Sequence, residues 1–195
     1  MKRRTKIMAV FCTGMLLLGL AGACSAGADN AGTGGSGAGE RQPSHTQTTY
    51  AYEVQELHAQ RDGLDIYGEI YIPQDAGEKM PAVIISHGFG GTHTVGQPYA
   101  RALAEHGYVA YCFDFCGGAA SNRSDGSPLE MSVFTEQADL EAVIAMIQEL
   151  DYVDQDNLFL MGTSQGGAVS AITGAAATDF MAIMPGWQQI ICWNI

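Results

Sequence analysis

The chain has 195 residues, of which 47% are hydrophobic and 15% charged, a balance typical of one packed domain rather than of a disordered polypeptide. Its formal net charge of −12 disfavours nucleic acids and anionic membrane surfaces as electrostatic partners, because like charges repel. Neutral or cationic small molecules are easier to accommodate.

The N-terminus has the three parts of a bacterial export signal. Residues 2–6 are mostly basic, residues 7–20 form an apolar run, and the small residues 21–23 lead to Cys24. Small residues directly before a cysteine resemble the lipoprotein processing site, where the cysteine is lipidated and becomes the new N-terminus. We predict a signal peptide over 1–23 and a lipid anchor on Cys24 at the outer face of the bacterial cell membrane. An ordinary cleaved signal is the alternative.

A flexible tether is predicted over residues 24–49. Residues 25–39 are almost all Gly, Ala and Ser, and residues 40–49 stay polar, so neither part can form a core. Such a spacer would hold a lipid-anchored domain clear of the bilayer, and the two predictions therefore support each other.

From residue 50 onward the pattern alternates between strands and helices. Two strands joined by a turn at 61–63 predict an antiparallel hairpin, and later apolar runs bounded by turns are typical of buried strands. The strands are expected over 50–58, 64–72, 81–86, 108–115, 157–161 and 180–184. Helices are expected over 98–106, ending at Gly107, after a cap at Ser132 with Glu136 in its first turn, and from 165 to about 177.

This order of elements predicts an α/β fold. Strands and helices that alternate after a hairpin indicate a mainly parallel sheet with helices on both faces, here over residues 50–184. Residues 185–195 show neither periodicity, and we interpret them as an aberrant tail. Cys112 and Cys116 lie in or beside an expected buried strand, so we predict core thiols there rather than metal ligands.

The motif with the clearest chemistry is Gly-Thr-Ser-Gln-Gly at residues 162–166. It matches the G-x-S-x-G nucleophile elbow and stands between an expected strand and an expected helix, as that motif requires. Gly162 and Gly166 let the backbone turn sharply, which exposes the hydroxyl of Ser164 at the N-terminus of the next helix. Ser164 is therefore the predicted nucleophile.

A second motif, His-Gly-Phe-Gly-Gly at residues 87–91, ends an earlier expected strand. Its glycines, Gly88 among them, free the backbone to direct N–H groups inward. The amides of Phe89 and Gln165 are the natural pair to bind the oxygen of a tetrahedral intermediate. His87 is expected to order this loop rather than to act as the base.

With both motifs in place, residues 54–176 resemble an α/β-hydrolase of the bacterial esterase branch, similar to cinnamoyl (feruloyl) esterases, dienelactone hydrolases and serine-aminopeptidase-like hydrolases. The resemblance implies acyl chemistry at Ser164 with Phe89 and Gln165 as the oxyanion hole. No cofactor or metal is expected, and the partner would be a small-molecule ester.

The same resemblance places the acid and the histidine of the triad after the nucleophile. The residues that follow Ser164 contain no histidine, and Asp179 is their sole acidic residue. We therefore expect a fold that is incomplete at its C-terminus and a chain that is inactive by itself. Of the other histidines, only His93, in the loop after the second motif, could approach the mouth of the site, and proximity in the chain is its sole support.

Three functions compete at this point. The first is a serine hydrolase of carboxylic esters. The second is a peptidase or amidase of the same fold, which the two motifs do not separate from an esterase. The third is a surface-anchored binding module that keeps the scaffold without catalysis.

Overall fold

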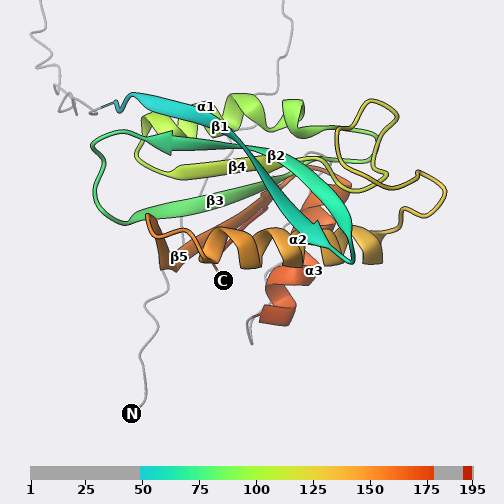
Figure 1. Cartoon of the computed structure of the whole chain (residues 1–195). Coiled ribbons are helices and arrows are strands. Elements are labelled where there is room, and N and C mark those ends of the chain that lie inside the picture. The colour runs from blue at the N-terminus through green and yellow to red at the C-terminus, as the bar shows by residue number, and fades with distance from the viewer. Residues whose placement is uncertain (1–48, 178–190, 195) are drawn as a thin grey trace, which may run out of the picture. The chain divides into compact units, whose positions relative to one another are not determined.

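The computed structural model describes residues 49–177 and 191–194 (Figure 1). The predicted signal peptide, Cys24 and nearly all of the tether lie outside the described residues, as do the predicted strand at 180–184 and most of the tail. Among the residues that are described, no helix has the length and apolar character needed to cross a membrane.

The described strands form one six-stranded sheet in the order β1-β2-β4-β3-β5-β6. Their bounds are β1 Tyr52–Arg61, β2 Leu64–Pro73, β3 Met80–Ser86, β4 Val109–Phe113, β5 Val153–Gly162 and β6 Ile191–Asn194. β3 pairs in parallel with β4 and β5, whereas the pairs β1–β2, β2–β4 and β5–β6 are antiparallel. The sheet is thus parallel in its centre and mixed as a whole, because the hairpin and β6 flank the parallel strands.

The predicted opening hairpin is confirmed. Arg61 pairs with Leu64, so only two residues form the turn. Both of them have positive φ, 51° at Asp62 and 82° at Gly63, which is the backbone that a tight hairpin turn requires.

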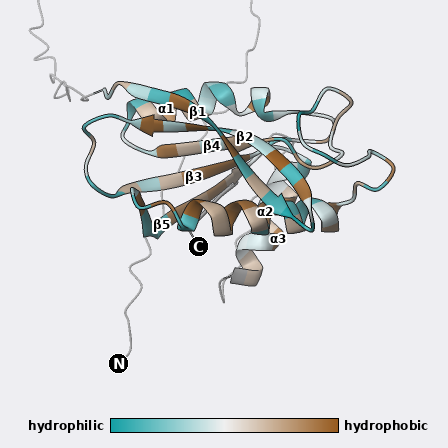
Figure 2. Ribbon diagram, in the orientation of Figure 1, coloured by the Kyte–Doolittle hydropathy of each residue, from teal (hydrophilic) through white to brown (hydrophobic). Residues whose placement is uncertain are grey.

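Helices cover both faces of the sheet, as predicted (Figure 1). α1 (Gln97–Glu105) buries Ala100 and Ala104 on one face, in a cluster with Val83 and Ile85 of β3. α2 (Val133–Gln148) and α3 (Gln165–Ala177) lie on the other face. There the core is formed by Ile84, Leu140, Val143, Ile147, Leu158, Leu160 and Val169, among others. Hydrophobic colour runs along the central strands in Figure 2.

The predicted helix ends are confirmed at two places. The Ser132 hydroxyl accepts a hydrogen bond from the Thr135 N–H at 3.2 Å, and the Thr135 side chain returns the contact to the Ser132 backbone, which closes a capping box before α2. Beyond α1, Gly107 adopts a φ of 86°, the left-handed conformation that ends many helices.

Cys112 and Cys116 are confirmed as core thiols. Cys112 belongs to the apolar layer beneath α1, and Cys116 belongs to the layer on the opposite face. Burial raises the pKa of each thiol to about 12, so both stay protonated and unreactive at neutral pH.

β6 lies within the segment 185–195, for which the sequence analysis expects no regular element. Residues Ile191–Asn194 pair antiparallel with the end of β5, from Phe159 to Gly162. A segment of four residues is too short for the periodicity argument to detect, because alternation needs more positions to stand out.

Candidate active site

Ser164 lies in the turn that joins β5 to α3. Gly162 ends the strand, Gln165 begins the helix, and Ser164 between them is exposed. Its φ of 52° is rare for a residue with a side chain and is typical of a sharp strand-to-helix elbow. The predicted local context of the motif is therefore present.

Close backbone contacts explain the glycines on either side of Ser164. A Cβ at Gly162 would lie 2.4 Å from the carbonyl oxygen of Gly166, and a Cβ at Gly166 would lie 2.2 Å from that of His87. Any side chain at Gly166 would therefore push the elbow away from the end of β3. Glycine is required at Gly162 for the elbow to turn back on itself, and at Gly166 for the elbow to approach the end of β3.

The two motifs lie side by side at the carboxyl edge of the parallel strands. Ser86 pairs with Gly162, and the Thr163 N–H donates to the Ser86 carbonyl oxygen at 3.1 Å. A Cβ at Gly88 would lie only 3.1 Å from the Cβ of Ser164. Residue 88 must consequently be small for the His-Gly-Phe-Gly-Gly loop to approach the serine.

The predicted oxyanion residues flank this contact. Phe89 directly follows Gly88, and its side chain is 74% exposed at the rim of the site. Gln165 is the first residue of α3, so its backbone N–H belongs to the first turn, where N–H groups lack an acceptor within the helix. Gln165 thus lies at the positive end of the α3 dipole, directly after Ser164.

His87 is buried and orders the loop, as predicted. Its Nδ1 lies 2.8 Å from the Gly88 carbonyl oxygen, and the Phe115 N–H donates to its Nε2 at 3.2 Å. The carbonyl can only accept, so Nδ1 carries the proton and the ring is neutral. Burial lowers the pKa of His87 and keeps it so at neutral pH.

His93, the histidine that could approach the mouth, is instead hydrogen-bonded within the core. His93 is buried, and its Nδ1 lies 2.8 Å from Asp114 Oδ1, while its Nε2 is 3.7 Å from Glu69 Oε1. Its ring also packs edge-on against Tyr67. The position in the chain, six residues after His87, suggested proximity to the site, but the ring contacts buried Asp114 after β4 and partly buried Glu69 of β2.

Glu136 belongs to the site although the sequence analysis gave it only a role at the helix terminus. It is 2% exposed, and its Oε2 accepts a hydrogen bond from Gln165 Nε2 at 2.7 Å. Burial raises the pKa of its carboxyl group. A long-range contact of this kind leaves no periodic signal in the sequence.

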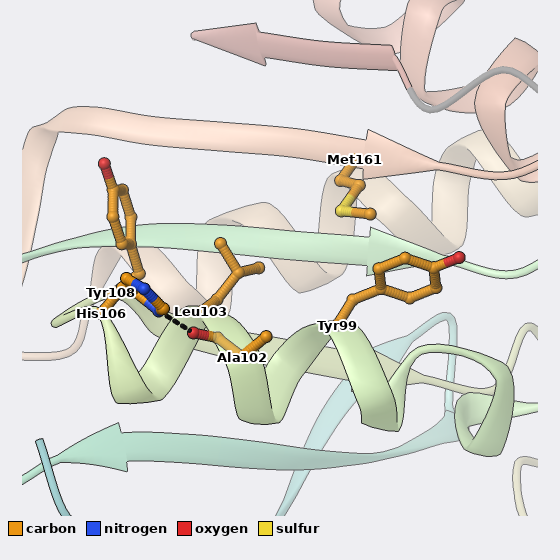
Figure 3. A pocket seen from close by; sticks show the side chains of 6 residues that line it. All are labelled: Tyr99, Ala102, Leu103, His106, Tyr108 and Met161. Atoms are coloured by element: carbon orange, nitrogen blue, oxygen red, sulfur yellow. Dashed lines mark hydrogen bonds between the residues drawn. The ribbon is translucent and has the colours of Figure 1, made fainter. Parts of the chain in front are cut away.

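A cavity of about 440 Å³ lies elsewhere, along α1 (Figure 3). Its lining is almost entirely apolar, and it contains no residue of the two motifs, so we do not include it in the site. The residues around it are Tyr99, Ala102, Leu103, His106, Tyr108 and Met161. Within the described part of the chain, no group of three or more His, Cys, Asp or Glu residues is placed to hold a metal ion.

A known family matches the part of the chain that carries the two motifs. The family model described as serine aminopeptidase, S33, matches residues 77–185, which is more than half of the chain and includes both motifs.

Curated relatives and solved structures are similar to this chain over part of their own length. The quorum-quenching protein AidA of Acinetobacter baumannii is 27% identical over 131 residues, which cover 66% of this chain and 42% of AidA. The uncharacterized protein YcjY of Escherichia coli is 32% identical over 107 residues, covering 52% of this chain and 34% of YcjY. Est1E of Butyrivibrio proteoclasticus, solved with ferulic acid bound, has a TM-score of 0.56 at 27% identity, with 64% of this chain and 49% of that one covered.

A further similar structure is DcsB, solved with a substrate analogue, at a TM-score of 0.53 and 29% identity, over 64% of this chain and 41% of that one. The chain therefore spans between 34% and 49% of the length of these four proteins.

Proposed function

The chain belongs to the serine aminopeptidase S33 family of α/β-hydrolases, and we propose that it acts on carboxylic esters through an acyl-enzyme on Ser164. The observation that carries the proposal is the elbow itself. Ser164 has positive φ, is exposed, and stands against Gly88 at the head of α3.

The proposed reaction has two halves. The Ser164 hydroxyl oxygen attacks the ester carbonyl carbon while a general base takes its proton, and the amides of Phe89 and Gln165 stabilise the resulting oxyanion. Collapse of this intermediate breaks the bond to the alcohol, which leaves with the proton. Water then adds to the acyl-enzyme and releases the acid, which restores the serine.

We also propose that these 195 residues alone react slowly. The rings of His87 and His93 hydrogen-bond to Gly88, Phe115 and Asp114, so both have other roles than activating Ser164. A serine without its base is a weak nucleophile, although the oxyanion hole and binding alone can sustain roughly 10³ to 10⁴ over the rate in water.

An amide substrate is the second candidate, because the matching family model is described as a serine aminopeptidase. The bound ferulic acid of Est1E favours an ester instead. Hydrolysis of an ester and an amide with the same acyl group separates the two. A non-catalytic binding module would cleave neither.

The test is reaction of the purified protein with a fluorophosphonate probe, beside Ser164→Ala and the matched control Ser121→Ala, whose serine is exposed in the segment after β4. We expect labelling of the protein and of Ser121→Ala, and at least about a 10³-fold lower rate for Ser164→Ala. Labelling that survives in Ser164→Ala would rule out this serine as the nucleophile. Labelling of none of the three, even after prolonged incubation, would favour the binding module.

A lipid anchor on Cys24 remains a separate proposal, supported by the signal-like residues 1–23 and the Gly, Ala and Ser spacer after them. In a bacterial host the protein should partition with membranes and into detergent, and Cys24→Ser should release it from them. Partition of both forms into the aqueous phase would refute the anchor.

A further inference from the structure

Glu136 combines burial with the lack of a described cationic partner. It is 2% exposed at the first turn of α2, and the partner that the structure gives its carboxyl group is the neutral side-chain amide of Gln165, 2.7 Å away. Carboxylates are almost never buried to this degree unless they are paired, because desolvation disfavours the charge. A role of the Glu136 carboxyl group beyond packing would offset its desolvation.

The start of α2 does not require Glu136. Ser132 and Thr135 already form a complete capping box there. An acidic residue can also favour the helix dipole from the exposed surface, without being desolvated. Stability of the helix terminus therefore does not explain why this carboxyl group points inward.

Asp139, one turn further along α2, shows the contrasting arrangement. It is fully buried, but it is paired with Arg61, whose Nε lies 2.5 Å from its Oδ1, and it accepts the Cys116 N–H at 2.9 Å. Asp139 thus ties the hairpin and the segment after β4 to the helix with a compensating charge. Its proximity also helps to raise the pKa of Glu136, so the second carboxyl group makes the first one more costly.

Glu136 hydrogen-bonds to the residue beside the nucleophile. Gln165 directly follows Ser164, and its side chain reaches Glu136 in the first turn of α2; its Nε2 also lies 3.9 Å from Sδ of Met131, two residues before that helix. A side chain fixed at its far end restricts rotation of its own backbone. The backbone amide of Gln165 is the one assigned above to the oxyanion hole.

We propose that Glu136 is a positioning residue for the oxyanion hole, acting through the Gln165 side chain to fix the direction of the Gln165 amide. This inference rests on the proposed function. The carboxyl group touches no reacting atom, and a preorganised donor is worth most when it needs no reorientation during the reaction.

The test compares Glu136→Ala, Glu136→Gln and Gln165→Met with Glu141→Gln, a matched control on the exposed side of the same helix. Complete loss of one oxyanion donor costs roughly 10² to 10³ in kcat, so misdirection of a retained donor should cost about tenfold. We expect that loss in kcat, with KM unchanged, for Glu136→Ala and for Gln165→Met. Glu136→Gln keeps an acceptor oxygen and should stay within about twofold, as should Glu141→Gln.

Combining Glu136→Ala with Gln165→Met gives a stringent readout. If the two side chains act as one unit, the double variant should be no slower than either single variant. Additive losses would overturn the proposal, and so would an unchanged kcat for Glu136→Ala. Fluorophosphonate labelling of Ser164→Ala, measured in parallel, separates the two claims, because labelling that survives in this variant refutes the proposed function rather than the positioning role.

Hydrogen exchange of the backbone amides in residues 162–168 tests the same idea without turnover. Exchange in this segment should be faster in Glu136→Ala and Gln165→Met and unchanged in Glu136→Gln and Glu141→Gln. Equal exchange in all four variants would refute the role of Glu136 even in a preparation that does not hydrolyse esters.

Discussion

Two regions at the carboxyl edge of the parallel strands are held in different ways. The loops after β3 and β5 approach each other closely at Gly88 and Gly166, and Gly162 lets the second loop turn back on itself. The segment that follows β4, residues 114–125, adds side-chain hydrogen bonds to Asp114 to its backbone hydrogen bonds and to a close contact at Gly117. Gly166 and Asp114 should therefore be sensitive to different kinds of substitution.

Asp114 is the centre of the second region. Its buried carboxylate accepts the His93 N–H at 2.5 Å and the Arg123 N–H at 2.7 Å, and the Ser124 hydroxyl donates to its carbonyl oxygen at 2.6 Å. Loss of the Asp114 carboxylate should therefore destabilise this segment, because the His93 and Arg123 N–H groups would lose their acceptor. At Gly166, by contrast, the added methyl group of an alanine would push the elbow away from the end of β3.

The largest effect is expected for Gly166→Ala. The added Cβ would lie 2.2 Å from the His87 carbonyl oxygen and 2.6 Å from that of Ser86, and both are backbone atoms at the end of β3. Relief requires the elbow to move, so the free energy of unfolding should fall by more than about 4 kcal/mol, and the probe reaction at Ser164 should be lost. Urea unfolding followed by circular dichroism measures the first quantity.

Gly90→Ala is the matched control in the neighbouring loop. Gly90 has positive φ, 68°, whereas Gly166 lies in α3 and does not, and a Cβ at Gly90 would meet nothing within 4 Å. At Gly90 only the left-handed backbone is penalised, by about 1 to 2 kcal/mol. Equal losses in the two variants would mean that the close contact at Gly166 costs no more than the left-handed backbone at Gly90.

A smaller but substantial effect is expected for Asp114→Ala. The substitution leaves the His93 and Arg123 N–H groups without their acceptor, and an unsatisfied buried donor costs about 1 to 3 kcal/mol. We expect a loss of about 3 to 5 kcal/mol in urea unfolding. Asp114→Asn retains one acceptor oxygen and should lose clearly less. If the two variants were equal, the negative charge and not the hydrogen bonds would hold the segment.

The contrast between the regions also explains what the sequence could predict. The glycine loops were found because Gly162 and Gly166 have a fixed spacing around Ser164 and few other residues can occupy such positions. The partners of His93 and Gln165 were missed because they come from 21 and 29 residues away, on other elements, and no local pattern encodes such contacts. β6 was missed because four residues carry too little periodicity, whereas the longer strands and α2 were found.

The smallest predicted effect concerns His87, which links the two regions. Its ring accepts the Phe115 N–H from the segment after β4 and contacts the Gly88 carbonyl within its own loop. A protonated ring could no longer accept at Nε2, so acid should loosen the link between the regions without breaking either one.

The sign of this effect follows from the lowered pKa of His87, which results mainly from burial. Between that lowered value and the ordinary value near 6.5, the unfolded chain binds a proton that the folded chain does not. Stability contributed by the neutral ring is therefore complete above about pH 6.5 and is lost as the pH falls through the folded pKa. Asp114 raises the pKa of His87 and His93 lowers it, so the pH dependence of the unfolding free energy depends on both neighbours. Unfolding free energies measured from pH 7.5 to 5 should fall less steeply in His87→Gln than in the parent protein. Parallel slopes for the two proteins would mean that this histidine does not link the two regions through its neutral form.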